Sequence, residues 1–265
     1  NGSDVLEARS VAADSAAAAD IPHAQLVVID SMLPDTGDLD LTVPGMLSAA
    51  PGEVAKDLAA RGALPDLAGH EVLLVGVGYT GPPQHPLGTG QRRALTDMWS
   101  AVIRVAHGAP RVLPVPRSAP PAEGPYTTRT VPVPSTEPLR PRDVSLTEDS
   151  SLGFFPNSTT FRDPVGARKA LTKIAAWLAA SPGRTVKITG TCASAGSAEG
   201  RKRLSTQRAE AVRRLLLDLH VPAAQISAVG AGYIASPPDR RSDGTLDPAA
   251  AALNRSIRLS FAESR

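Results

Sequence analysis

Glycines that follow an apolar segment form the first pattern whose spacing is typical of a known chemistry. The residues GVGYTG (76–81) have the spacing G-x-G-x-x-G and overlap the apolar run EVLLVGV (71–77). In dinucleotide-binding proteins such glycines bring the backbone close to a pyrophosphate, which lies at the N-terminus of the helix that follows directly. Here Pro82-Pro83 follow, and the next helical pattern begins only near Gln91. The sequence therefore indicates a glycine-rich turn and predicts no nucleotide cofactor.

Metal and nucleophile patterns are incomplete. Asp30-Ser31 ends an apolar run, as in the D-x-S-x-S metal-binding pattern, but Pro34 breaks that pattern. The single cysteine, Cys192, excludes an intrachain disulfide and a cysteine-rich zinc site, and Cys192–Gly196 lacks the first glycine of a nucleophile elbow. The histidines show no i, i+4 pair; they are His23, His70, His85, His107 and His220. We expect no metal, no cofactor and no catalytic residue. An enzyme built around Asp30 and the glycine turn stays open as a third hypothesis.

The segment VKITGTCASAGSAEGRKRLSTQRAEAV (186–212) carries the most specific pattern. It resembles the OmpA-like, or MotB/Pal-type, peptidoglycan-associated domain, whose pattern is a strand, G-H-T-D-x-x-G-S and then N-x-x-L-S-x-x-R-A-x-x-V. Three flanking segments agree, namely FFPNSTTF (154–161), ISAVGAGY (226–233) and the Asn254-Arg255 pair before Ile257. The resemblance covers about 152–262. The residues that match in register are Gly190, Gly196, Ser197, Leu204, Ser205, Arg208, Ala209 and Val212.

The resemblance implies a binding site for the diaminopimelate arm of a peptidoglycan stem peptide. In that family an Asp at the end of the central strand meets the ligand's ammonium, and the Arg before the Ala on the next helix meets its carboxylate. A zwitterion needs one anion and one cation, and Arg offers a planar two-pronged fork for a carboxylate. The resemblance places ligand contacts at Arg208, Asn157, Thr191, Ala193 and Ser194.

This chain departs from the family pattern at the ligand Asp. That position is Ala193, the preceding His and Thr are Thr191 and Cys192, and the Asn before the L-S pair is Arg201. A charge left without its partner costs roughly 2–5 kcal/mol, which is on the order of 30- to 3,000-fold in affinity. We therefore expect weak binding unless another acid substitutes. The candidates are Asp163, Glu199 and the acids within 239–247.

Structural roles compete with ligand roles at several of these positions. Arg208 lies four residues from both Leu204 and Val212, so its stem could cover the edge of the core while its charge stays in water. Asn157 could be a turn residue that bonds its own backbone. Asn254-Arg255 is expected to order the last strand rather than to touch the ligand.

Composition and charge limit the function classes. The chain has 265 residues with a formal charge of +2, which gives no electrostatic reason to expect nucleic acid as a partner. The longest apolar run is IAAWLAA (174–180), far short of the roughly 20 residues of a membrane span. The chain also opens without a signal-peptide pattern, so we expect that any leader or anchor has been removed.

A proline-rich stretch divides the chain. Residues 114–141 contain nine prolines, and each X-Pro pair favours extended backbone. We expect a tail or a loosely held helix at 1–20, an α/β domain at 21–116, a linker at 117–150 and an OmpA-like domain at 151–265.

Apolar periodicity predicts mixed α/β structure in both domains. For the first domain we expect a small α/β layer of strands 24–30, 71–77 and 111–116 with helices 44–50, 53–61 and 91–107. For the second we expect a β-α-β-α-β-β sandwich of strands 152–155, 185–189, 226–233 and 256–261 with helices 163–180 and 198–219, and a loop at 235–250.

These observations lead to two functional hypotheses besides the enzyme. The first is a non-catalytic cell-envelope protein, extracytoplasmic and anchored to a membrane through a missing segment, which binds peptidoglycan stem peptides without a covalent bond. The second keeps the fold but not the ligand, so that the module is a docking or dimerisation surface for an envelope protein. The two hypotheses differ in whether the module still binds peptidoglycan when Ala193 replaces the Asp of the family pattern.

Overall fold

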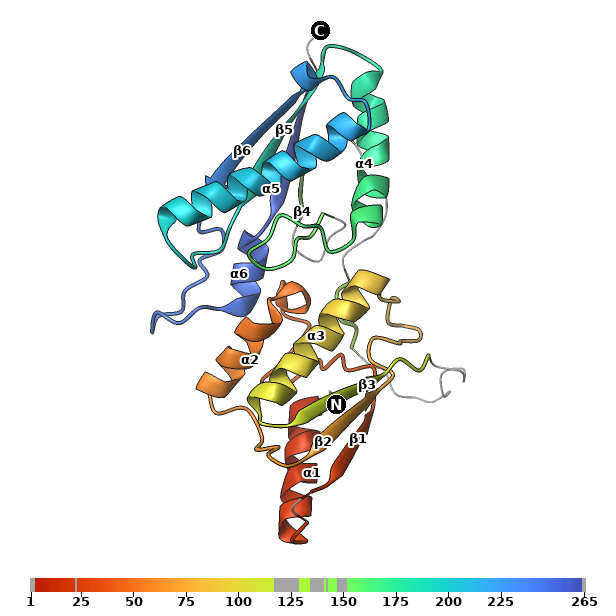
Figure 1. Cartoon of the computed structure of the whole chain (residues 1–265), viewed down its shortest axis with the longest axis vertical. Helices are drawn as coiled ribbons and strands as arrows, with labels where there is room; N and C mark the ends of the chain where they lie inside the picture. The colour runs from red at the N-terminus through yellow and green to blue at the C-terminus, as the bar shows by residue number, and fades with distance from the viewer. Residues whose placement is uncertain are drawn as a thin grey trace. The chain divides into compact units, whose positions relative to one another are not determined.

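The structure is a computed structural model that describes residues 3–21, 23–116, 129–133, 141, 143–146 and 152–263. The chain divides into two compact units, Asn1–Val133 and Pro134–Arg265 (Figure 1). Most of the expected linker at 117–150 lies outside the described residues. None of the helices in the described ranges combines the length and apolar character that a membrane crossing needs.

The first unit contains a parallel sheet with strand order β1-β2-β3. Its strands are β1 (Gln25–Ile29), β2 (Glu71–Val75) and β3 (Ala109–Leu113), and the crossovers contain α2 (Pro51–Ala60) and α3 (Thr89–Val105). Right-handed crossovers between strands in sequential order place both helices on the same face of the sheet. The burial pattern agrees, because Val72 and Leu74 are buried while Ile29 is 79% exposed on the opposite face.

Of the two alternatives for residues 1–20, a tail or a loosely held helix, the structure shows a helix. Val5–Ala18 forms helix α1, and the Asp4 side chain caps it by accepting a hydrogen bond from the Glu7 backbone. Arg9 is 2% exposed, and its guanidinium lies 4.2 Å from the centre of the Trp99 ring. An alanine-rich helix shows little apolar periodicity. Because the charged residue Arg9 lies on the buried face, the sequence pattern does not reveal which face of the helix is buried. The short helix expected at 44–50 is only a 3₁₀ turn, η1 (Met46–Ser48).

The second unit contains a mixed sheet with strand order β4-β7-β5-β6. Strands β5 and β6 are parallel, and β7 pairs antiparallel with both β5 and β4. Apolar side chains of α4 and α5 pack with those of the sheet in one core, and Figure 1 shows α5 crossing β5 and β6. The elements are β4 (Val144–Leu146), α4 (Pro164–Ala179), β5 (Arg184–Thr191), α5 (Ala198–Asp218), η2 (Ala223–Gln225), β6 (Ile226–Gly232), α6 (Pro248–Asn254) and β7 (Ile257–Glu263).

Two elements of this unit differ from the prediction. Residues 152–155 form no strand: Phe154 makes an isolated bridge to Phe161, and the two rings stack with centroids 4.6 Å apart. The outer strand is instead β4, within the segment assigned to the linker. The expected loop at 235–250 contains the start of α6, where Asp247 caps the backbone of Ala249 and Ala250 and Pro248 occupies the first helical position.

Candidate functional site

Helix α5 approaches the sheet closely because two strand positions have no side chain. A Cβ at Gly190 would lie 2.2 Å from the Ser205 carbonyl oxygen, and one at Gly230 would lie 2.3 Å from the Thr206 nitrogen. The Ser205 hydroxyl also accepts a hydrogen bond from the Gly232 backbone at 3.0 Å. These contacts fix the position of α5, and therefore that of Arg208, relative to the end of β5.

Arg208 is buried and holds the 154–161 turn. It is 3% exposed; its Nε donates to the Ser158 carbonyl at 3.0 Å and its terminal Nη2 donates to the Phe155 carbonyl at 3.2 Å. The guanidinium also lies 5.2 Å from the centre of the Phe154 ring. Arg208 therefore connects the turn at 154–161 to α5. This role goes beyond covering the edge of the core with an aliphatic stem.

Asn157 lies at the tip of the turn that Arg208 holds. Its φ is +50°, the left-handed conformation that Asn tolerates better than most residues. The side chain is exposed, and the turn is closed by the Ser158 backbone, which donates to the Phe155 carbonyl at 3.1 Å. The left-handed backbone conformation is therefore sufficient to explain why Asn occupies this position.

Thr191 connects the end of β5 to the segment before β7. Its Oγ1 lies 2.6 Å from the Asn254 carbonyl oxygen and 2.9 Å from the Ser256 hydroxyl, and it accepts from the Ser256 backbone at 3.1 Å. Thr191 itself is buried. Its hydroxyl is thus engaged in the protein's own hydrogen bonds.

Ala193 and Ser194 form the start of the loop that follows β5. Ala193 is 3% exposed. The Ser194 backbone donates to Oδ2 of Asp239 at 2.8 Å, and its hydroxyl accepts from Nε of Arg240 at 2.9 Å. Arg201 donates to the Ser194 carbonyl at 2.9 Å. Beside the position where the family has its Asp, this chain therefore has a carboxylate from a segment 45 residues later.

Asp239 is fully buried, with 0% of its surface exposed. Burial by itself raises the pKa of this carboxyl, but hydrogen bonds from Ser194, Tyr233 and Asn254 outweigh burial and hold the pKa below its ordinary value. Asp239 is thus ionised at neutral pH. The sequence identified the range 239–247 but could not select this acid, because neither its burial nor its neighbours appear in any local pattern.

The other candidate acids have structural roles or lie at the surface. Asp163 caps α4 by accepting from the Gly166 backbone at 2.9 Å, and Asp247 caps α6. Asp243 holds the backbone and hydroxyl of Thr245, whereas Glu199 is exposed in the first turn of α5.

Asn254 orders the loop between β6 and β7. Its Oδ1 accepts from the Ser236 backbone at 3.2 Å, and its Nδ2 donates to the Pro237 carbonyl at 2.8 Å. Together with the bonds from Thr191, these contacts hold the segments around Asp239 and Ser256 next to the end of β5.

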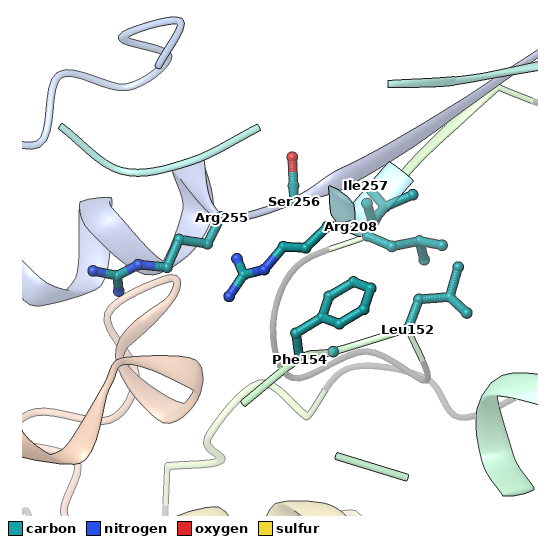
Figure 2. A pocket seen from close by; sticks show the side chains of 8 residues that line it. Leu152, Phe154, Arg208, Arg255, Ser256 and Ile257 are labelled. Carbon is teal, nitrogen blue, oxygen red and sulfur yellow. The ribbon is translucent and has the colours of Figure 1, made fainter. Parts of the chain in front are cut away.

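A small hollow lies beside Arg208 (Figure 2). In Figure 2 the guanidinium of Arg208 lies on the side of the Phe154 ring, whereas the side chain of Arg255 extends away from that ring. Only about 10 Å³ is open to the centre of a water-sized sphere, which is room for about one water molecule. The lining residues are Leu146, Leu152, Gly153, Phe154, Arg208, Arg255, Ser256 and Ile257. The hollow combines two arginine residues with an apolar wall, and it is far too small to hold a peptide.

In the first unit, the side chain of Arg92 occupies the space beside the glycine turn (76–81). Gly76 and Gly78 have φ of +86° and +70°, and a Cβ on Gly78 would lie 2.7 Å from Cγ of Arg92. The next helix, α3, begins only at Thr89. In the described part of the chain, no three His, Cys, Asp or Glu side chains come together as metal ligands, and Cys192 is buried.

Comparisons with known proteins identify the second unit. The model of the OmpA family matches residues 154–250. No curated protein matches the chain.

Among solved structures, the peptidoglycan-associated lipoprotein from Burkholderia pseudomallei is similar at 30% identity, with 44% of this chain and 89% of that chain covered and a TM-score of 0.37. The OmpA-like domain of FopA1 from Francisella tularensis is 17% identical over 46% of this chain and 73% of that chain, with a TM-score of 0.33. The periplasmic domain of MotB from Helicobacter pylori is 16% identical over 46% and 74%, with a TM-score of 0.35.

Proposed function

We propose that this chain, which belongs to the OmpA family through residues 154–250, is a non-catalytic cell-envelope protein whose second unit binds peptidoglycan stem peptides non-covalently. The name of the relative from Burkholderia pseudomallei describes that protein as associated with peptidoglycan, and the Helicobacter pylori relative is a periplasmic domain. These relatives support an extracytoplasmic location for this chain.

The observation that carries the proposal is the position of Arg208. Its guanidinium lines the hollow beside Phe154, and its bonds to Phe155 and Ser158 fix its direction. A guanidinium held in this way is suited to a carboxylate, because little side-chain freedom is lost when the ligand binds. Arg208 holds the turn that contains Asn157, and Asn254 accepts a hydrogen bond from Thr191 at the start of the 191–194 loop. We include Asn157, Thr191, Ala193 and Ser194 in the proposed site.

The test is co-sedimentation of the purified chain with insoluble sacculi that contain diaminopimelate. Arg208→Ala is the test variant, and Arg214→Ala is the control because Arg214 is an exposed residue of the same helix. We expect the parent and the control to pellet and Arg208→Ala to remain in solution. Absence of the parent from the pellet would overturn the proposal.

A second function is favoured by the closed state of the site. Thr191 and Asp239 are engaged internally, and the hollow holds about one water, as expected for a module that has kept the fold and lost the ligand. Such a module would be a docking or dimerisation surface in the envelope. Parent protein that stays in solution with sacculi but sediments as a dimer in analytical ultracentrifugation would support this second function.

A further inference from the structure

We propose that Asp239 supplies the carboxylate that binds the ligand's ammonium group, in place of the Asp that is absent at position 193. This inference rests on the proposed function, because it assigns the second half of the same site. It changes where the anion comes from: the loop between β6 and β7 rather than the end of β5. The ligand class is an α-amino acid end, with one ammonium and one carboxylate on the same carbon, as in the diaminopimelate arm.

The location of Asp239 carries the first step. Oδ2 of Asp239 is 2.8 Å from the Ser194 nitrogen, and Ser194 is the residue next to Ala193. Within the described part of 134–265, Asp239 is also the one buried carboxylate. The negative charge that is missing at position 193 is therefore supplied by Asp239, which lies beside that position but comes from another segment.

The hydrogen bonding of the carboxylate carries the second step. Oδ2 accepts from the Ser194 backbone, and the side chains of Ser194, Tyr233 and Asn254 also stabilise the charged carboxylate. Oδ1 is buried, and among the described residues no hydrogen bond reaches this oxygen. Buried acceptors without a donor are rare in folded proteins, and leaving one unsatisfied costs free energy. An ammonium group provides three donors and a positive charge, which is the complement of this oxygen.

Neighbouring side chains enclose Asp239 and the adjoining Ser194. The carboxylate is closed to solvent in this structure. Arg240 is exposed and covers Ser194 through the bond from its Nε to the hydroxyl, while the Tyr233 hydroxyl accepts from the Asp239 backbone at 3.3 Å. Because the carboxylate is closed to solvent, ligand binding requires the side chains around it to move.

The decisive experiment moves the carboxylate. Binding of free diaminopimelate to the full chain is measured by calorimetry for the parent, Asp239→Asn, Ala193→Asp and the double variant Ala193→Asp/Asp239→Asn. Loss of the carboxylate is expected to weaken binding by at least about 30-fold. The double variant is expected to recover most of that loss, because the charge returns one residue from Ser194. Asp239→Asn that binds as tightly as the parent would overturn the inference.

A ligand comparison on the parent protein keeps the inference testable if Asp239→Asn does not fold. Pimelate has the same carbon chain and both carboxylates but no amino groups. We expect the parent to bind diaminopimelate at least about tenfold more tightly than pimelate, in line with the strength of a charge-assisted hydrogen bond. Equal affinities would show that no anion meets the ammonium and would overturn the inference. A parent that binds neither diaminopimelate nor sacculi would instead overturn the proposed function.

Discussion

Nε of Arg208 donates a hydrogen bond to the Ser158 carbonyl at 3.0 Å, across 50 positions of the sequence. This bond connects the middle of α5 to the turn that opens the family-matched region. The same guanidinium reaches Phe155 and lies over Phe154. One buried side chain therefore both shapes the turn and faces the hollow, so its effects on stability and on binding must be separated by the choice of variant.

Arg208→Lys should lower stability while it keeps the positive charge. The ammonium of Lys is a compact group and cannot span both carbonyls as the guanidinium fork does. A buried carbonyl left without its donor costs about 1–3 kcal/mol, and the free energy of unfolding in urea should fall by that amount. Arg214→Lys is the surface control, and equal losses in the two variants would contradict the role assigned to Arg208.

Gly190→Ala should destabilise the second unit more than Gly200→Ala, which changes a glycine within α5. The new Cβ would lie 2.2 Å from the Ser205 carbonyl oxygen, and the backbone of α5 cannot yield without breaking its packing on β5 and β6. Overpacking of this kind costs about 1–3 kcal/mol or more. In Gly200→Ala, within α5, the new Cβ would meet only the Ser197 hydroxyl at 3.1 Å. Thermal unfolding of both variants checks the difference, and equal melting temperatures would argue against the close approach.

Arg9→Met should stabilise the first unit near neutral pH. Neither terminal nitrogen of Arg9 has a hydrogen-bond partner among the described residues, and burial lowers its pKa to about 9. Replacing a buried ion by an apolar side chain of similar size is often stabilising, by about 1–4 kcal/mol. Arg104→Met, on the exposed side of α3, is the control.

The pH dependence of this gain follows from the same shift. Below about pH 9 Arg9 is charged in both states, so the cost of burying the charge is present in full. As the pH rises through about 9, the folded protein releases the proton and the unfolded chain keeps it, so folding of the parent becomes more favourable. Urea unfolding at pH 7 to 10.5 should show the advantage of Arg9→Met shrinking; an advantage that stays constant would count against a buried charge.

Asp239 should stabilise the chain at neutral pH and lose this effect in acid. Its folded pKa lies below the ordinary value of 3.8, so its contribution is present above that value and disappears as the pH falls through the folded pKa. The difference in unfolding free energy between the parent and Asp239→Asn should be constant from pH 5 to 8 and shrink below about pH 4. Asp218→Asn, an exposed change at the end of α5, controls for loss of one negative charge.

Local patterns predicted most of the elements, because periodicity and caps act within a few residues. The expected helix at 163–180 is α4, where Asp163 is the cap and Pro164 the first residue, and the expected strand at 185–189 is the centre of β5. The failures have physical causes. Helix α1 has weak periodicity because it is rich in alanine and buries Arg9. Strand β4 has only three residues and directly follows the proline-rich stretch 114–141, so it falls within the expected linker.

The sequence by itself determined the family pattern, the loss of the Asp at Ala193 and the survival of Arg208, because these depend on residue type and spacing alone. Only the tertiary structure decided which acid lies beside Ala193, that Arg208 is bound to Phe155 and Ser158, and that Thr191 is engaged with Asn254. Each of these contacts joins positions at least 45 apart. Such contacts depend on how the sheet and α5 pack, which no local pattern records.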